Sequence, residues 1–403
     1  MNHKNLGIYI HIPFCVQKCL YCDFISGPAT VDKHKSYVNQ LLKEIELRTE
    51  RFENYCINSV FIGGGTPSVV DADLIANILC KLKEAFVFAD DCECSIEVNP
   101  GTVDYEKLLK YHMAGINRLS IGLQSCNERE LKLLGRIHDY SSFEETYRMA
   151  RKAGFDNINV DLMSSVPEQT VDSFTDSLRK VAGLIPEHIS VYSLIVEEGT
   201  PFYHMDLNLP DEETERSIYY KTGEILKEYG YEQYEISNYA KPGRECRHNV
   251  RYWQCMEYIG FGVAAASCFN DIRWKNTENI NTYLNAELAE VISEFDREAE
   301  NGFLSKEDAF ICGHDFWTEI DCLSQNDKMS EFMFMGLRMN AGISETEFEM
   351  LFGLTPEQIY GEVIDKHLQN GLLERVEGYI RLTSKGRDIC NFVMADFLLS
   401  ESF

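Results

Sequence analysis

The chain has 403 residues, enough for two or three domains, and a formal net charge of -27 with a pI near 4.8, which makes nucleic acid and anionic membrane surfaces poor partners. No charged leader precedes an apolar run, and no window reaches the roughly 18 to 20 apolar residues of a membrane-spanning helix, so we expect a cytoplasmic protein with no transmembrane segment. In a reducing compartment the 14 cysteines are expected to bind metal, to react or to be buried rather than to form disulfides.

Six short runs rich in β-branched and aromatic residues predict six strands in about the first 200 residues. The runs are 8–12, 59–64, 94–99, 118–124, 157–166 and 188–196. Between them, apolar residues spaced three or four positions apart predict amphipathic helices. This alternation predicts an α/β fold with right-handed crossovers and a parallel sheet, arranged either as a barrel or as a doubly wound sheet.

Unusual residues stand at the carboxyl ends of these predicted strands, where parallel α/β folds collect functional groups. Three cysteines follow the first strand and GGGTPS follows the second. Glu97 and Gln124 end the third and fourth strands, and Asp161 lies within the fifth. We therefore expect the functional site along this edge of the sheet.

The alternation stops at about residue 205, and the stretch from 276 to 325 has no readable pattern. Within that stretch, 303–321 reads as extra length, a loop or an accessory lid that contains Cys312 and His314. Before it, the string ECRHNVRYW occupies 245–253. We expect a first domain at 1–240, a connecting region at 241–325 that carries HNVRYW, and a C-terminal domain at 326–403.

The C-terminal domain is predicted to be small and mostly helical, with a winged-helix-like arrangement. An apolar helix begins near Met329, Ser344 and Glu347 form a capping box for a second helix, and Glu377 with Gly378 forms the turn of a hairpin. Acidic residues outnumber basic ones from Gln325 onward, so a protein or a ligand is a better partner than DNA.

Cys15, Cys19 and Cys22 form a Cys-x3-Cys-x2-Cys pattern directly after the first predicted strand. A structural zinc site uses four ligands, usually in two pairs, and no second pair follows here. A 4Fe-4S cluster fits better, because one short loop can bind three of its irons and leave the fourth open. An open iron makes this loop a reactive site.

With Tyr21 just before the last cysteine, the pattern resembles the signature of the radical S-adenosylmethionine (SAM) superfamily. The resemblance implies a partial (β/α)6 barrel and a SAM molecule whose amino and carboxylate groups bind the open iron. It also implies that an electron from the cluster cleaves SAM to a 5′-deoxyadenosyl radical. The electron would come from a reductant such as flavodoxin or ferredoxin.

Further motifs resemble the oxygen-independent coproporphyrinogen III oxidase family and, within it, the HemW branch of haem chaperones. They are YIHIPFC, FIGGGTPS, SIEVNP, NRLSIGLQS, LLGR, INVDL, ECRHNVRYW and GLLERVEGYIRLTSKG. The resemblance extends over almost the whole chain and is weakest between 276 and 325. It implies haem as a further ligand and a haem-accepting protein as a partner.

The resemblance also implies a set of residues around SAM. They are Tyr9, Tyr21, Gly64, Gly65, Thr66, Glu97, Gln124, Arg136 and Asp161. Glycines let backbone approach the methionine amino group of SAM, and Arg136 offers a fork for a carboxylate. Each residue also has a plainer interpretation: Tyr9 as a core aromatic, the glycines as a tight turn, Glu97 as a solvated strand end, and Arg136 with Asp161 as a structural ion pair. His138 reads as a surface residue.

His248, Tyr252 and Trp253 belong to an HNxxYW motif that the resemblance to the HemW branch links to haem binding. Imidazole is a common axial ligand of haem iron, and the two aromatic rings offer flat apolar area to a porphyrin. Without the resemblance, the string reads as a loop that ends on a core aromatic pair. Cys246 is either a further iron ligand or a buried thiol.

Two features separate the chain from the oxidases proper, which carry a fourth cysteine two residues after the third and a longer N-terminal extension. Here that position is Phe24, and 14 residues precede Cys15. A third feature concerns the HemW branch itself: Ala266 stands where other chains of the branch have a histidine. We expect a haem chaperone. A coproporphyrinogen III oxidase and another radical SAM reaction on a tetrapyrrole stay open as alternatives, and so does the question whether the chain is an enzyme.

Overall fold

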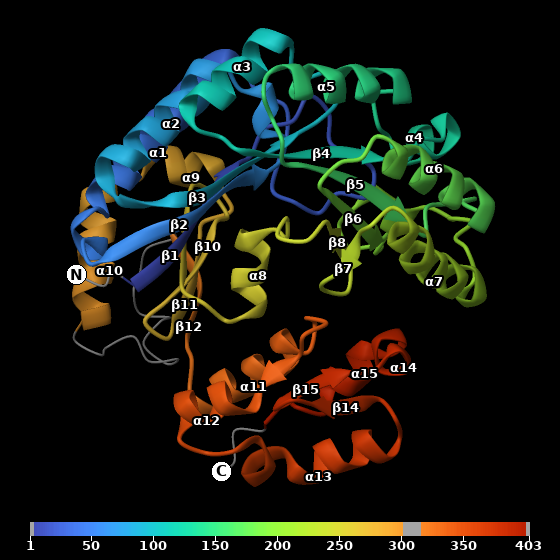
Figure 1. Cartoon of the computed structure of the whole chain (residues 1–403). Helices are drawn as coiled ribbons and strands as arrows, with labels where there is room; N and C mark the ends of the chain where they lie inside the picture. The colour runs from blue at the N-terminus through green and yellow to red at the C-terminus, as the bar shows by residue number, and fades with distance from the viewer. Residues whose placement is uncertain (1–3, 301–315, 400–403) are drawn as a thin grey trace. The chain divides into compact units, whose positions relative to one another are not determined.

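The computed structural model describes residues 4–300 and 316–399 and divides into two compact units (Figure 1). The first unit consists of Met1–Gly230 and Glu257–Cys322, and the second of Tyr231–Met256 and Leu323–Phe403. Among the described helices, none combines the length and the apolarity that crossing a bilayer requires.

The first unit begins with six strands that alternate with helices, as predicted. The strands are β1 (Lys4–Ile12), β2 (Tyr55–Gly64), β3 (Val87–Val98), β4 (Arg118–Gln124), β5 (Ile158–Ser164) and β6 (His188–Ser193). The helices are α1 (Val31–Leu47), α2 (Ala72–Ala85), α3 (Tyr105–Ala114), α4 (Glu128–Leu133), α5 (Tyr140–Lys152), α6 (Val171–Gly183) and α7 (Glu212–Glu228). Short 3-10 helices are η1 (Glu50–Phe52), η2 (Pro67–Val69) and η3 (Pro201–His204). Consecutive strands from β1 to β6 pair in parallel, and the helices line the outer side of the open sheet (Figure 1). The predicted α/β fold is confirmed.

Local sequence explains where the outer helices begin and which face they bury. Thr30, Asp71 and Asp104 cap α1, α2 and α3, because each side chain accepts a hydrogen bond from a backbone N–H of the first turn. The apolar face of α1 is buried, and so is most of β1 from Leu6 onward. Because β1 to β6 run parallel, their carboxyl ends lie at one edge of the sheet, which we call the carboxyl edge.

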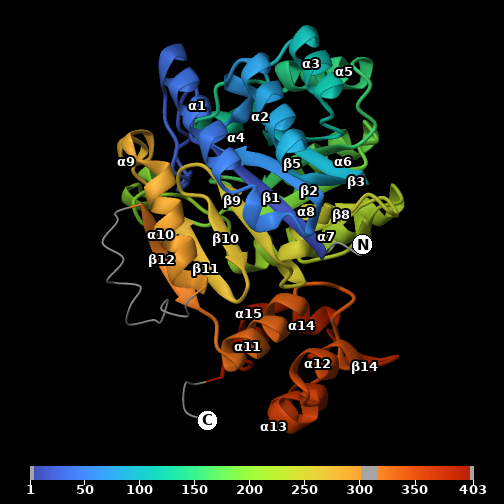
Figure 2. The ribbon, with the colours of Figure 1, turned by 90° about the vertical axis from the view of Figure 1, so that its left-hand side faces the viewer.

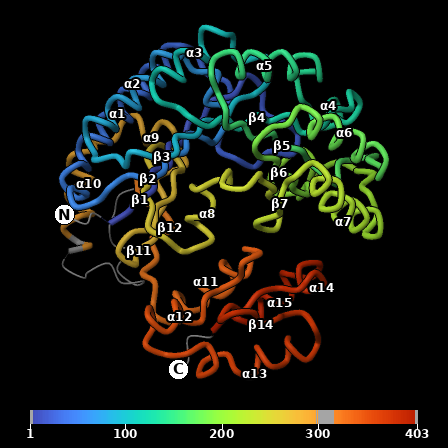
Figure 3. The backbone as a smooth tube through the Cα atoms, in the orientation of Figure 1, coloured from blue at the N-terminus to red at the C-terminus, as the bar shows by residue number. Residues whose placement is uncertain are grey.

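Four further strands extend the sheet beside β1 and were not predicted from the sequence. They are β9 (Tyr258–Phe261), β10 (Ala266–Phe269), β11 (Ile272–Asn276) and β12 (Trp317–Cys322). β9 pairs in parallel with β1, and the others follow as antiparallel neighbours in the order β9-β10-β11-β12 (Figure 2). Figure 3 shows β11 and β12 on the β1 side of the sheet. The helices α9 (Ile280–Asn285) and α10 (Leu288–Glu300) lie between β11 and β12 in the chain. The stretch read as unpatterned thus contains regular structure, although 303–315, with Cys312 and His314, lies outside the described residues.

A buried carboxylate joins this extension to α1. Glu44 is fully buried and accepts hydrogen bonds from the Gly262 N–H at 2.9 Å, the Asn276 amide at 2.9 Å and the Tyr283 hydroxyl at 2.6 Å. The Tyr37 hydroxyl donates to the carbonyl oxygen of His11 at 2.7 Å. Because buried acceptors need donors, these contacts fix the extension against β1 and α1.

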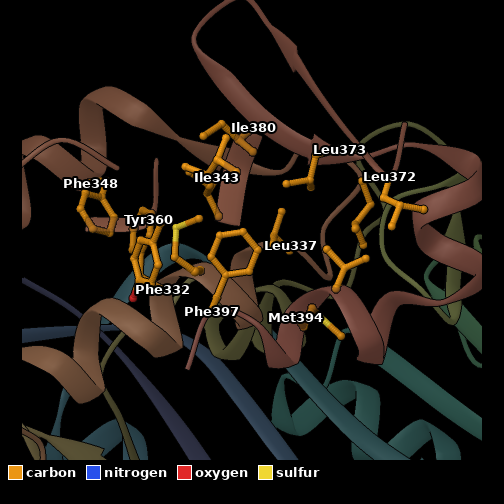
Figure 4. Close-up of a cluster of buried hydrophobic side chains, with 14 of the residues drawn as sticks. Phe332, Leu337, Ile343, Phe348, Tyr360, Leu372, Leu373, Ile380, Met394 and Phe397 are labelled. Atoms are coloured by element: carbon orange, nitrogen blue, oxygen red, sulfur yellow. The ribbon is translucent and has the colours of Figure 1, made fainter. Parts of the chain in front are cut away.

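The second unit has the order helix, strand, helix, helix, strand, strand that defines a winged helix. Its elements are α11 (Gln325–Gly336), β13 (Ile343–Ser344), α12 (Glu345–Phe352), α13 (Pro356–Gln369), β14 (Leu373–Val376), β15 (Tyr379–Leu382), α14 (Ser384–Asp388) and α15 (Cys390–Ala395). Ser344 caps α12 as predicted. Glu377 and Gly378 both have positive φ, 52° and 81°, as a tight hairpin turn requires. Figure 4 shows the apolar core that the helices and the hairpin share.

Residues 231–256 also belong to the second unit, so the observed division differs from the three predicted regions. This segment contains β7 (Glu232–Gln233), β8 (Asn238–Ala240) and α8 (Arg247–Trp253). The Asn340 N–H donates to the Tyr234 carbonyl at 2.9 Å, and the Arg338 guanidinium lies 4.3 Å from the ring centre of Trp253. The predicted connecting region 241–325 is thus divided, because its first part packs with the winged helix and its later part continues the sheet.

Candidate functional site

The three cysteines lie on a loop between β1 and α1 that is closed at its base. The Cys15 N–H donates to the Gly27 carbonyl at 3.1 Å, and the Gly27 N–H donates to the Pro13 carbonyl at 3.1 Å. Cys15, Cys19 and Cys22 are free thiols and are half-buried. We call residues 13–27 the cluster loop. It presents three reduced sulfurs from one ordered turn of chain.

The donor set fits an iron-sulfur cluster. Within residues 4–300 and 316–399, no three His, Cys, Asp or Glu side chains gather closely enough to hold one metal ion. A 4Fe-4S cluster makes a different demand, because each of its cysteines binds a separate iron. Three thiols spread along a closed loop meet that demand without a fourth protein ligand.

Side chains donate hydrogen bonds to two of the sulfurs of this loop, and Tyr21 is a further hydrogen-bond partner of Cys19. The Thr66 hydroxyl lies 3.5 Å from Cys15 Sγ, and Arg136 Nη1 lies 3.5 Å from Cys19 Sγ. Asn99 contacts both donors, at 2.8 Å in each case. Thr66 and Arg136, two of the predicted residues, therefore lie beside the cluster loop.

The glycines after β2 are required by close packing against the cluster loop and β1. A Cβ atom on Gly65 would lie 2.8 Å from the Phe14 carbonyl oxygen and 2.9 Å from Ser26. Gly64 has φ +112°, and a Cβ there would lie 2.6 Å from the His11 ring. The Gly65 N–H also donates to the Ile12 carbonyl at 2.9 Å. The end of β2 can therefore lie directly on the loop only without side chains.

Tyr9 and His11 join β1 to the far side of the cluster loop. His11 Nε2 lies 3.1 Å from the Ile25 carbonyl oxygen, and Nδ1 lies 3.0 Å from the Tyr9 hydroxyl. A carbonyl oxygen only accepts, so Nε2 carries the proton and the Tyr9 hydroxyl donates to Nδ1. Burial lowers the pKa of His11 to about 4, so the ring is neutral. The Tyr9 ring stacks on Phe61. Tyr9 therefore combines a packed ring with a polar contact at the site.

Glu97 is half-buried near the end of β3, and its carboxyl group is partly desolvated. Burial raises the pKa of its carboxyl group to about 8, and the nearby Asp161 carboxylate adds to the rise. The Gly64 N–H donates to Glu97 Oε2 at 3.1 Å, and this hydrogen bond lowers the pKa of the carboxyl group. The interpretation of Glu97 as a solvated residue is wrong, because an exposed carboxyl group would not be desolvated.

Gln124 and Asp161 lie on adjacent strands of the carboxyl edge, and each holds a specific partner. Gln124 has φ 74°, and its side-chain oxygen accepts from the Tyr192 hydroxyl at 2.9 Å. Asp161 accepts from the Asn159 amide at 2.7 Å and from the Ser120 hydroxyl at 3.2 Å. Burial raises the pKa of Asp161, and the hydrogen bond from Asn159 is the largest influence that lowers it.

Arg136 does not form the alternative ion pair with Asp161 among the described contacts. Its Nη2 donates instead to the Gly122 carbonyl at 2.6 Å and to Asn99. Burial opposes the charge of Arg136, but the neighbouring Tyr21 hydroxyl and Cys19 thiol raise its pKa, so it stays a cation. Tyr21 packs against Phe202, with ring centres 6.4 Å apart.

His138 is a buried residue, contrary to the expectation of a surface position. Its Nε2 lies 3.1 Å from the Leu123 carbonyl oxygen, and burial together with Arg136 lowers its pKa to about 4. The sequence offers no apolar pattern around His138, and its burial follows from the turn after α4.

The predicted haem residues lie in the second unit, on α8. His248 is fully buried, and its Nε2 lies 2.8 Å from the Tyr252 hydroxyl, with the two rings edge to face. The Trp253 ring packs against the guanidinium of Arg338. Cys246 is buried, as its plainer interpretation expected. Iron ligation through His248 Nε2 would therefore require Tyr252 to release this nitrogen.

Similar proteins share nearly the whole chain. The curated heme chaperone HemW of Haemophilus influenzae is 33% identical over 98% of this chain and 98% of its own length. The HemW proteins of Escherichia coli and Bacillus subtilis are each 33% identical, over 98% and 97% of this chain and 98% of each relative. The chain belongs to the HemW family. Residues 9–181 of this HemW-family chain match the radical SAM superfamily, and 323–389 match the HemN C-terminal domain.

A solved structure confirms the fold of this HemW-family chain. Coproporphyrinogen III oxidase (HemN) from Escherichia coli, described as a radical SAM enzyme, superposes with a TM-score of 0.81 at 24% identity, covering 98% of this chain and 90% of that one. At this identity the likeness is evidence for the fold alone. Membership of the radical SAM superfamily implies a 4Fe-4S cluster and SAM.

Sequence reasoning missed several residues that contact the predicted set in this HemW-family chain. They are His11, Asn99, Ser120, Asn159 and Tyr192. Asn99 and Tyr192 are polar residues at or near the carboxyl ends of β3 and β6, and that position was an available signal, whereas Asn159 lies near the start of β5.

Proposed function

We propose that this protein holds a 4Fe-4S cluster on Cys15, Cys19 and Cys22, binds SAM beside it, and carries haem for transfer to an acceptor protein. The observation that supports the cluster most directly is the closed loop with three free thiols, two of which receive side-chain hydrogen bonds. The support for haem transfer is that the relatives are named as the heme chaperone HemW.

The residues around the loop suit a cationic ligand that also carries a carboxylate. Glu97 on β3 and Asp161 on β5 are half-buried carboxyl groups on either side of β4, and Arg136 is a half-buried cation beside Cys19. We assign Arg136 to the carboxylate of SAM and the two acidic residues to its cationic and hydroxyl groups. Tyr9, Tyr21, Gly64, Gly65, Thr66 and Gln124 complete this proposed site. When bound, the cluster supplies the electron that cleaves SAM, and a reductant such as flavodoxin or ferredoxin in the cytoplasm would renew it.

Haem is assigned to α8 through His248, with Tyr252 and Trp253 as aromatic neighbours. Because His248 Nε2 is engaged by Tyr252, haem binding through this atom exchanges one hydrogen bond for an iron bond. Tyr252→Phe keeps the aromatic ring and removes the hydroxyl that contacts this nitrogen, so it tests the ring and the hydroxyl separately.

The test is anaerobic reconstitution with iron and sulfide, followed by addition of haem, SAM and a reductant. Substituting Cys22 by Ala is expected to abolish the cluster absorption, whereas the exposed Cys80→Ala leaves it intact. His248→Ala is expected to abolish haem binding, Tyr252→Phe to retain it, and His112→Ala on α3 to leave it unchanged. Retained haem affinity in His248→Ala would overturn the assignment of haem to α8.

Coproporphyrinogen III is supplied in a parallel reaction, since an oxidase is the alternative function. Formation of protoporphyrinogen at enzymatic rates would replace the chaperone proposal with oxidative decarboxylation. An unchanged cluster spectrum in each of Cys15→Ala, Cys19→Ala and Cys22→Ala would overturn the cluster assignment itself.

A further inference from the structure

One amide side chain connects the two groups that donate hydrogen bonds to the cluster loop. Asn99 follows β3, and its Nδ2 donates to Thr66 Oγ1 at 2.8 Å, while its Oδ1 accepts from Arg136 Nη2 at 2.8 Å. A guanidinium only donates, so the amide oxygen must face Arg136 and the amide nitrogen must face Thr66. The orientation of the Asn99 amide is therefore fixed by its partners.

This orientation decides where the single hydroxyl hydrogen of Thr66 points. The Thr66 oxygen accepts from Asn99, so its one hydrogen is left for Cys15 Sγ, 3.5 Å away. A hydroxyl has one donor and can rotate, and without the Asn99 donor nothing would hold it toward the sulfur.

The same amide helps to hold the guanidinium of Arg136. Nη2 is held between Asn99 Oδ1 and the Gly122 carbonyl, and this leaves Nη1 on Cys19 Sγ at 3.5 Å. Space is tight here, because a Cβ on Gly122 would lie 2.8 Å from Asn99 Oδ1. Two of the three cysteine sulfurs thus receive hydrogen bonds whose donors share one partner.

We propose that Asn99 is a positioning residue that raises the reduction potential of the cluster by holding Thr66 on Cys15 and Arg136 on Cys19. The inference rests on the proposed cluster on these cysteines. Hydrogen bonds to the sulfurs of an iron-sulfur cluster are among the factors that set its potential, because they stabilise the more negative, reduced state.

Asparagine suits this role and aspartate does not. A carboxylate at this position still accepts from Arg136, but it cannot donate to Thr66, so the Thr66 hydrogen would turn to the carboxylate and leave Cys15. It would also add a negative charge beside the cluster. Both effects lower the reduction potential. Asn99→Ser removes the bridge without adding charge.

The backbone at Asn99 is held independently of its side chain, so these variants are expected to fold. The Asn99 N–H donates to the Ser68 hydroxyl at 3.2 Å, and its carbonyl accepts from the Thr102 hydroxyl at 2.7 Å. The matched control is Asn54→Asp. Asn54 is exposed and precedes β2, whose ten residues place it about 30 Å from the carboxyl edge.

The experiment is a redox titration of the reconstituted cluster, followed by electron paramagnetic resonance. Asn99→Asp is expected to lower the equilibrium constant for reduction by about tenfold or more, which is about 59 mV for a one-electron couple. Asn99→Ser is expected to lower it less, and Asn54→Asp to match the wild type. Thr66→Val combined with Asn99→Ser should shift the potential by less than the sum of the single shifts.

Equal potentials in the wild type, Asn99→Asp and Asn99→Ser would overturn the inference, whereas a wild-type protein that assembles no cluster would overturn the proposed function instead. If a variant fails to assemble the cluster, a crystal structure of the cluster-free variant decides. In Asn99→Ser, the Arg136 guanidinium is expected to move away from Cys19 Sγ, because Asn99 Oδ1 no longer holds Nη2. An Arg136 guanidinium and a Thr66 hydroxyl that keep their contacts with Cys19 and Cys15 would refute the positioning role.

Discussion

Glu97→Gln tests whether the end of β3 is as desolvated as the structure indicates. In the folded protein, burial and then the Asp161 carboxylate raise the pKa of Glu97 to about 8, from an ordinary value of 4.5. A glutamine has nearly the same shape and can still accept from the Gly64 N–H, but it cannot ionise. The variant therefore removes the titration and keeps the packing.

The magnitude follows from the difference between the two pKa values. Between about pH 4.5 and about pH 8, folded Glu97 keeps a proton that the unfolded chain has lost, so the free energy of unfolding falls by about 1.4 kcal/mol per pH unit. The stabilisation is complete below the unfolded pKa and is lost as the pH rises through the folded pKa. Over this window the loss reaches at most about 5 kcal/mol, and relaxation around the ionised group reduces it.

The assay is hydrogen exchange in urea on peptides from β3 of the cluster-free protein, at several pH values between about 5 and 9. We expect Glu97→Gln to become progressively more stable than the wild type as the pH rises, by several kcal/mol at the alkaline end. The exposed Glu84→Gln on α2 serves as the control and should follow the wild type. A stability difference between Glu97→Gln and the wild type that does not vary with pH would refute the reasoning.

Two further predictions concern stability alone. Glu44→Ala leaves the Gly262 N–H, the Asn276 amide and the Tyr283 hydroxyl without their shared carboxylate acceptor, and it should destabilise the first unit by about 3 to 5 kcal/mol in urea unfolding. The control Glu53→Ala, at an exposed position, should change the stability by almost nothing. A loss of less than about 1 kcal/mol in Glu44→Ala would contradict the importance of this hydrogen-bond network. Both turn positions have positive φ, which asparagine and glycine adopt more easily than other residues. Glu377→Asn should therefore stabilise the second unit by about 0.5 to 1 kcal/mol, and Gly378→Ala should destabilise it by about 1 kcal/mol. Stability changes of the same sign in both variants would show that backbone conformation does not govern this turn.

The strands β1 to β6 could be predicted because each is a short apolar run that alternates with an amphipathic helix, so local pattern and tertiary role agree. The cysteine spacing and the turn at Glu377 and Gly378 are equally local signals. β9 could not be found in this way, because its four residues are stabilised by pairing with β1, which lies far away in the sequence. Short strands carry little local signal when their partners are distant.

The site shows the same limit. Thr66 and Arg136 stand in motifs and could be named from the sequence, but Asn99 acts through contacts with residues on two other loops. The burial of His138 and Glu97 likewise depends on the surrounding chain rather than on their neighbours in the sequence. Motif reading finds residue types, and only the folded chain shows which of them share a partner.

The chain passes from one unit to the other after Gly230, after Met256 and after Cys322. A fragment that starts at Leu323 would therefore lack α8 and the Tyr234 carbonyl that Asn340 contacts. A fragment that ends at Gly230 would lack the strands that cover the outer edge of β1. A single crossover after Cys322 would keep the first unit whole but would divide the second unit, because Tyr231–Met256 would stay behind. The HNVRYW segment therefore has to be kept together with Leu323–Phe403 if the second unit is to be complete, although β9 to β12 lie between them in the chain.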